Sequence, residues 1–112
     1  MLLVIDVGNT NMALGVYEGE RLVVVWRLTT QRERTVDELG ILCRTLFTLE
    51  GLDVSVVHAI VIASVVPPLD FALRKMAQTY FHLDPLFVDW RTPTGMPILY
   101  ENPQEVGADR IA

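Results

Sequence analysis

Short apolar runs separated by polar turns make up the first third of the chain. Residues 2–6 are a run of apolar side chains that ends in one carboxylate, Asp6. Two further apolar runs follow at residues 12–18 and 21–29, with a Glu-Gly-Glu turn between them. Runs of this length, bounded by turn residues, predict strands, and a short turn containing glycine joins neighbouring strands as a hairpin. The pattern therefore predicts three consecutive strands.

A helical period replaces these short runs after residue 35. Thr35 and Glu38 form a Thr-x-x-Glu capping box, which is typical of a helix N-terminus. The helix is predicted over residues 36–50, and Gly51 is a natural C-terminal stop. Its apolar positions recur with helical spacing, at Leu39, Leu42, Cys43, Leu46, Phe47 and Leu49.

Strands and helices then alternate. Residues 58–65 are nearly all apolar, which predicts a strand buried on both faces. Pro67-Pro68 ends that strand and suits the first turn of a helix that reaches about residue 81. A fifth strand is predicted over residues 85–89. This order predicts an α/β fold with flanking helices and a mixed sheet, in which a three-strand antiparallel meander is followed by parallel crossovers.

Composition and charge exclude several classes of function. The chain has 112 residues, enough for one domain, and its nine basic and fourteen acidic side chains give a net charge of −5. Clustered positive charge is absent, so we expect no nucleic-acid partner. Lys75 is the only lysine and no Gly-Lys-Ser/Thr occurs, which excludes a P-loop. No apolar run reaches the length of a membrane span and no signal peptide is evident, so we expect a cytoplasmic protein without a membrane partner.

The end of the first strand is the first candidate site. Asp6-x-Gly8-x-Thr10-Asn11 follows an apolar strand, where an unpaired charge is costly and is usually kept for a purpose. Side-chain and backbone donors next to one acid suit a phosphate group with its divalent metal. A hairpin turn whose Asp and Asn side chains bond their own backbone is the alternative.

A second candidate site lies near the end of the chain. Residues 90–103 hold three prolines and a glycine, which predicts an irregular loop of a length usually reserved for function. Asn102 then caps a new helix, with Gly107, Asp109 and Arg110 in its first turns. A carboxylate can accept the proton of a substrate hydroxyl, and an arginine can clamp a substrate carboxylate. The alternative is an ordinary helix start with a surface arginine.

Three motifs together resemble type III pantothenate kinase, a family of the acetate and sugar kinase, Hsp70 and actin superfamily. They occur in the family's order and at its usual separations, and the resemblance covers the whole chain. The motifs are Asp6-Val7-Gly8-Asn9-Thr10-Asn11, Ala63-Ser64-Val65-Val66-Pro67, and Tyr100-Glu101-Asn102-Pro103 continuing to Gly107-Ala108-Asp109-Arg110. The resemblance implies a ribonuclease H-like sheet, which agrees with the order of elements predicted from the pattern.

The resemblance also implies an activity and its partners. Members of this family phosphorylate pantothenate from ATP, the first committed step of coenzyme A synthesis, with Mg²⁺ or another divalent metal and a monovalent cation, K⁺ or NH₄⁺. They act as homodimers. Carried over by position, Asp6 organises the metal and Asp109 is the proton acceptor. The implied ATP phosphate turn consists of Asp6, Val7, Gly8, Asn9, Thr10, Asn11, Met12 and Ala13, and the implied pantothenate site of Tyr100, Gly107, Ala108, Asp109 and Arg110.

The length of the chain departs from the family, whose members are roughly twice as long, with two similar domains around a cleft. We therefore expect residues 1–112 to be the N-terminal domain of a two-domain kinase, without turnover by itself. The second phosphate motif, the adenine pocket and the monovalent-cation ligands are expected beyond Ala112. Ser64-Val65-Val66-Pro67 either lines the same cleft or is a plain strand end.

Three other functions stay open. The chain could belong to a kinase of the same superfamily with another acceptor, to a non-catalytic regulator on the same kinase fold, or to a folding or dimerisation module. Asp6 and Asp109 are both present, which favours the enzyme.

Overall fold

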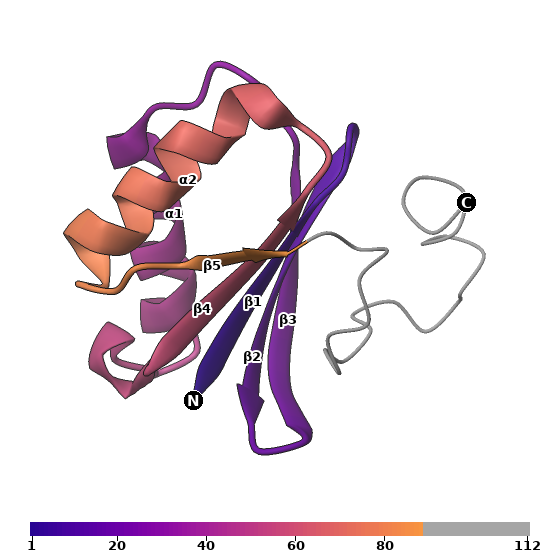
Figure 1. Ribbon diagram of the computed structural model, residues 1–112. Helices are drawn as coiled ribbons and strands as arrows, with labels where there is room; N and C mark the ends of the chain where they lie inside the picture. Colours follow the sequence, from indigo (N-terminus) through magenta and orange to yellow (C-terminus); the bar gives the residue numbers. More distant parts are fainter. Residues whose placement is uncertain (89–112) are drawn as a thin grey trace.

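The computed structural model describes residues 1–88, and Figure 1 shows a twisted sheet with two helices on one side. The predicted elements beyond this range, the loop over residues 90–103 and the helix after it, lie outside the described residues. The elements in chain order are β1 (Leu2–Val7), β2 (Asn11–Glu18), β3 (Arg21–Thr29), α1 (Val36–Leu49), a short 3-10 helix η1 (Val54–Val56), β4 (Ala59–Ser64), α2 (Pro67–Tyr80) and β5 (Leu86–Val88).

The sheet has the mixed topology that the order of elements predicts. Its strand order is β3-β2-β1-β4-β5. The pairs β1/β2 and β2/β3 are antiparallel, whereas β1/β4 and β4/β5 are parallel. The predicted antiparallel meander followed by parallel crossovers is therefore confirmed, and β1 is the central strand.

Successive side chains of β1 point to opposite faces of the sheet. Leu3, Ile5 and Val7 belong to the main core, in which α1 and α2 also take part. Val4 belongs to a smaller cluster with Ala13 and Tyr17. Asp6 shares the alternation of Val4, so its carboxylate lies on the face opposite to α1 and α2.

Local sequence signals explain where the helices begin and end. The amide of Glu38 donates to Thr35 Oγ1 at 3.2 Å and the amide of Thr35 donates to Glu38 Oε1 at 2.8 Å, which confirms the capping box. α2 begins with proline, which has no N–H to leave unsatisfied in the first turn. Gly51 follows α1 with φ of 72°, a backbone conformation that favours glycine.

Two local features were not predicted. Asp53 accepts a hydrogen bond from the amide of Ser55 at 2.8 Å and so starts the short 3-10 helix η1. The pairing of β2 with β3 also shifts register between Val16 and Tyr17. Neither feature interrupts β1, which keeps its regular pairing with β2 on one side and β4 on the other.

Candidate functional site

Asp6 lies at the carboxyl end of the central strand, between two alanines. It pairs with Ala13 on β2 and with Ala63 on β4. Because paired residues share a face of the sheet, no side chain larger than a methyl group flanks the carboxylate along the sheet. The carboxylate is half-buried. The carboxyl ends of parallel strands are where open α/β sheets bind ligands, so β1 and β4 bring Asp6 to a suitable edge.

The turn after Asp6 is a hairpin whose tip leaves N–H groups unbonded. The amide of Gly8 donates to the carbonyl of Asn11 at 2.9 Å and closes the turn. Asn9 and Thr10 are exposed, and within residues 1–88 their N–H groups donate no hydrogen bond. Successive free N–H groups in a turn form a concave site for an anion.

The alternative interpretation of this turn was that its Asp and Asn side chains bond their own backbone, and for the asparagines the structure gives a different arrangement. Within residues 1–88, the side chains of Asn9, Thr10 and Asn11 make no such bond; the oxygen of Asn9 instead accepts from an arginine. Gly8 is buried and is not among the glycines with positive φ. Its backbone conformation therefore does not itself require glycine.

Thr30, the first residue after β3, holds the turn in place. Its amide donates to the carbonyl of Thr10 at 2.8 Å, and its Oγ1 donates to the carbonyl of Gly8 at 2.7 Å. In a planar trans peptide the C=O and N–H point in opposite directions. The N–H groups that follow these two carbonyls, those of Asn9 and Asn11, consequently point away from Thr30.

Arg32 and Arg34 follow Thr30 and reach the same region. Arg32 Nη2 donates to Asn9 Oδ1 at 3.4 Å, and Arg34 Nη2 donates to the carbonyl of Thr29 at 3.4 Å. No candidate site residue was predicted among residues 31–34. The available signal was the hairpin register, because the pairing of Asn11 with Thr29 places the residues after β3 beside the β1–β2 turn.

The start of α2 lies next to the turn but is poorly suited to bind an anion itself. The amide of Val65 donates to the carbonyl of Val7 at 3.0 Å, which joins the end of β4 to the end of β1. The first two helical residues are prolines without an N–H, and the amide of Leu69 already donates to the carbonyl of Val66. Ser64 Oγ accepts from the amide of Val66 at 3.0 Å, so this serine is used locally, as a plain strand end predicts.

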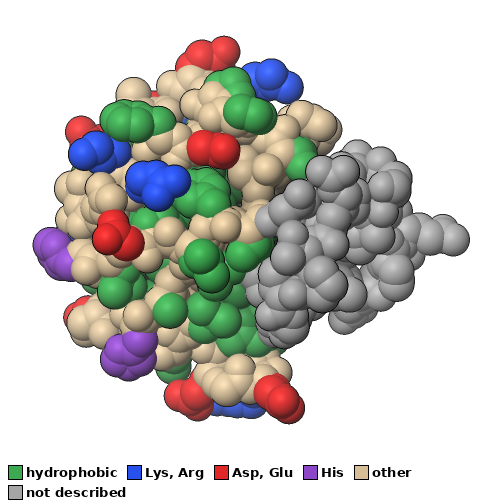
Figure 2. All heavy atoms as spheres, in the orientation of Figure 1, with side chains coloured by type: hydrophobic (Ala, Val, Ile, Leu, Met, Phe, Trp, Pro, Cys, Tyr) green, Lys and Arg blue, Asp and Glu red, His purple; other side chains and the backbone are tan. Residues whose placement is uncertain are grey.

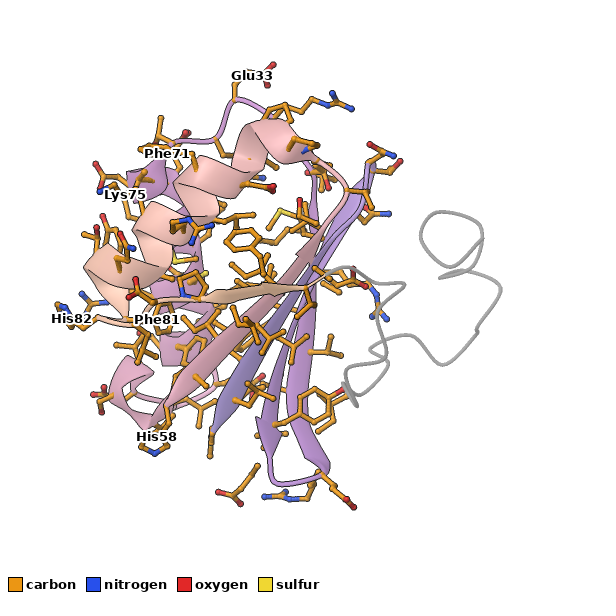
Figure 3. All side chains as sticks on the ribbon, viewed as in Figure 1. Glu33, His58, Phe71, Lys75, Phe81 and His82 are labelled. Carbon is orange, nitrogen blue, oxygen red and sulfur yellow. The ribbon has the colours of Figure 1, made fainter. Side chains whose placement is uncertain are left out.

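Cys43, Lys75 and the two histidines lie away from the turn. Burial raises the pKa of the Cys43 thiol to about 12, in agreement with its predicted role as a core side chain. Figure 3 shows that Lys75, His58 and His82 project outward from parts of the fold remote from the β1–β2 turn. On the face in Figure 2, acidic and basic side chains are interspersed and form no continuous positive patch.

The described residues offer one carboxylate for a metal rather than a cage. No group of three or more His, Cys, Asp or Glu side chains within residues 1–88 is arranged to hold an ion. Mg²⁺ is commonly held by one or two carboxylates together with substrate phosphates and water, which a single aspartate at a phosphate turn fits.

In this part of the chain, neither helix is long and apolar enough to cross a membrane. The predicted pantothenate residues, Tyr100, Gly107, Ala108, Asp109 and Arg110, lie outside the described residues.

Sequence comparison finds similar proteins that share one family name. A family model described as type III pantothenate kinase matches residues 2–112. A similar protein named type III pantothenate kinase, from Myxococcus xanthus (strain DK1622), is 59% identical over 99% of this chain and 43% of its own length. Another of the same name, from Anaeromyxobacter dehalogenans (strain 2CP-C), is 60% identical over 99% of this chain and 44% of its own length. The chain thus spans less than half the length of these relatives.

The fold also resembles a solved sugar kinase. The crystal structure of a ROK hexokinase from Thermus thermophilus matches with a TM-score of 0.58 and 18% identity, over 78% of this chain and 34% of that one. At this identity the likeness concerns the fold alone. Since the family model covers nearly every residue, the chain belongs to the type III pantothenate kinase family.

Proposed function

We propose that this chain is the phosphate-binding, N-terminal part of an enzyme that transfers the terminal phosphoryl group of ATP to pantothenate, the first step of coenzyme A synthesis. One observation carries the proposal: an exposed turn with two unbonded N–H groups follows the only carboxylate of the central strand. Family membership supports the choice of pantothenate as acceptor.

In this proposal Asp6 and the turn that follows it hold the phosphates. The N–H groups of Asn9 and Thr10 donate to phosphate oxygens, and residues Asp6 to Ala13 form the wall of that site. Asp6 holds a Mg²⁺ ion, which would neutralise the charge that develops on the phosphates during transfer. Thr30 keeps the N–H group of Asn9 oriented by donating to the carbonyl of Gly8, and its bond to the carbonyl of Thr10 holds the other end of the turn.

The acceptor side of the reaction is assigned to the last motif of the chain. Arg110 clamps the carboxylate of pantothenate, and Tyr100, Gly107 and Ala108 line its site. Asp109 accepts the proton of the substrate hydroxyl as that oxygen bonds to the terminal phosphorus and the bond to ADP breaks. These roles rest on the motif and on family membership.

The remaining properties follow from the family and from the coverage of its members. We infer that residues 1–112 are one domain of a two-domain cytoplasmic homodimer, which needs K⁺ or NH₄⁺ and has no turnover as this chain alone. The matched length supports the domain assignment, because the chain covers 43–44% of the relatives.

Substitution of Asp6 tests the proposal in the full-length protein. Asp6→Asn is expected to lower kcat for pantothenate by at least about 100-fold, because a metal ligand is lost. Asp84→Asn is the matched control: Asp84 is an exposed carboxylate whose Oδ1 accepts from Gln78 at 2.7 Å, and asparagine keeps that oxygen. Steady-state rates with ATP, Mg²⁺ and pantothenate measure both. Full activity of Asp6→Asn would overturn the role of Asp6, and transfer to another acceptor but not to pantothenate would overturn the assigned substrate.

A further inference from the structure

Arg32 is a cation beside the turn with no acidic partner. Its side chain is exposed, and its contact with Asn9 Oδ1 is the one hydrogen bond that it makes within residues 1–88. An ion pair elsewhere in this part of the chain joins Arg21 to Glu18 at 3.0 Å, at the opposite end of the β2–β3 hairpin. Within residues 1–88, Arg32 therefore forms no ion pair with a carboxylate.

The contact between Arg32 and Asn9 is weak enough to be exchanged. At 3.4 Å it is longer than the usual range for an N–H···O hydrogen bond. A guanidinium group has five donors, so one such contact leaves most of them available. The amide oxygen of Asn9 thus keeps the guanidinium close to the unbonded N–H groups without occupying it.

Arg34 is placed differently, although it lies only two residues farther along. Its Nη2 donates to the carbonyl of Thr29, and its Nε is buried without a hydrogen-bond partner among the described residues. The guanidinium of Arg34 is therefore turned toward the end of β3, whereas that of Arg32 lies at the exposed tip of the turn.

The net negative charge of the chain would oppose the binding of a triphosphate unless a cationic side chain lay at the site. A triphosphate must approach a chain with a net charge of −5, and the only lysine is on α2 over the ring of Phe71, at 6.0 Å from the ring centroid. Guanidinium and phosphate form paired, charge-assisted hydrogen bonds. Building on the proposed function, we infer that Arg32 binds the phosphates of the nucleotide at the Gly8–Asn11 turn and supplies the cationic side chain that a P-loop lysine supplies in other nucleotide-binding proteins.

The test compares Arg32→Gln, Arg32→Lys and Arg21→Gln in the full-length protein. Arg21→Gln removes one positive charge at the opposite end of the hairpin and is the matched control. Steady-state kinetics give KM for ATP, KM for pantothenate and kcat. Titration calorimetry with ADP and Mg²⁺ gives Kd without requiring turnover, and thermal melting checks that each variant is folded.

Arg32→Gln is expected to raise KM for ATP and Kd for ADP by about tenfold, with KM for pantothenate unchanged. Arg32→Lys should recover part of the loss, because it keeps the charge but not the planar fork, and Arg21→Gln should match the unaltered protein. The inference is overturned if Arg32→Gln leaves both nucleotide constants within about twofold, or if it raises KM for pantothenate equally. If the unaltered protein binds ADP but does not phosphorylate pantothenate, the proposed function fails, and the ADP measurement still decides the role of Arg32.

Discussion

Thr30 is the residue on which the shape of the phosphate turn most depends. It binds two carbonyls of the turn: its hydroxyl donates to that of Gly8, and its amide donates to that of Thr10. The side chain is half-buried, so water replaces the lost hydroxyl only in part. A change that removes the hydroxyl alone would therefore free the Gly8 carbonyl and loosen the orientation of the next N–H group.

Thr30→Val makes that change with little alteration of volume. We expect KM for ATP to rise by about three- to tenfold, and the free energy of unfolding to fall by about 1 kcal/mol, the usual value of one hydrogen bond. Thr29→Val is the control, because Thr29 is exposed and its hydroxyl makes no hydrogen bond within residues 1–88. Equal effects of the two substitutions on KM for ATP would show that the hydroxyl of Thr30 does not position the turn.

At the scale of single elements, most of the described secondary structure was predictable because its signals are local. Hydrophobic period, the capping box and the prolines at the start of α2 each act within a few residues. The short 3-10 helix η1 was missed because it depends on one hydrogen bond, from the backbone amide of Ser55 to the carboxylate of Asp53. Thr30 and Arg32 were missed as site residues for a different reason. Their place beside the turn depends on the pairing register of β2 and β3, and no local sequence pattern predicts that register.

The contact between α1 and α2 gives a prediction at this scale. Gly40 on α1 faces the ring of Tyr80 on α2 so closely that a Cβ at Gly40 would overlap the ring. The hydroxyl of Tyr80 also donates to Asp37 Oδ1 at 2.6 Å, one turn before Gly40. The ring is thus held over the glycine and cannot move without breaking this hydrogen bond.

Gly40→Ala is therefore expected to destabilise the protein by about 1 kcal/mol or more, although alanine is the better helix former by about the same amount. In a Tyr80→Ala background the ring is gone, and the same substitution should stabilise by about 0.5–1 kcal/mol. Urea denaturation of the four proteins in this cycle measures the coupling. If Gly40→Ala has the same effect in both backgrounds, the ring is not the obstacle.

At the scale of the whole molecule, the sequence pattern predicted the class of sheet, and the structure added its strand order. The central position of β1 brings Asp6, the β1–β2 turn and the end of β4 together at one edge. The metal role of Asp6 and the pantothenate site at Tyr100, Gly107, Ala108, Asp109 and Arg110 stay predictions. The pantothenate site consists of residues outside those described, and its assignment rests on the motif and on family membership.

The buried core also sets how the molecule responds to alkaline pH. Burial raises the pKa of the Cys43 thiol from 9.0 to about 12 and raises the pKa of Tyr17, while the hydrogen bond to Asp37 raises the pKa of Tyr80. Each of these groups keeps its proton in the folded protein at a pH where the unfolded chain releases it. Unfolding then releases protons, so the free energy of unfolding falls as pH rises.

For Cys43 this loss begins near pH 9, where the unfolded thiol titrates, and continues toward pH 12. One proton gives a slope of up to about 1.4 kcal/mol per pH unit in that window, and no slope below it. Cys43→Ala removes the thiol, so its stability should fall less steeply between pH 9 and pH 11 than that of the unaltered protein, with parallel curves between pH 6 and pH 8. Tyr80→Phe is a useful second variant, because it removes a half-buried titrating hydroxyl and leaves the thiol slope in place. Urea denaturation at each pH measures the free energy of unfolding. If that free energy falls equally steeply above pH 9 for Cys43→Ala and for the unaltered protein, the folded core does not hold the thiol proton.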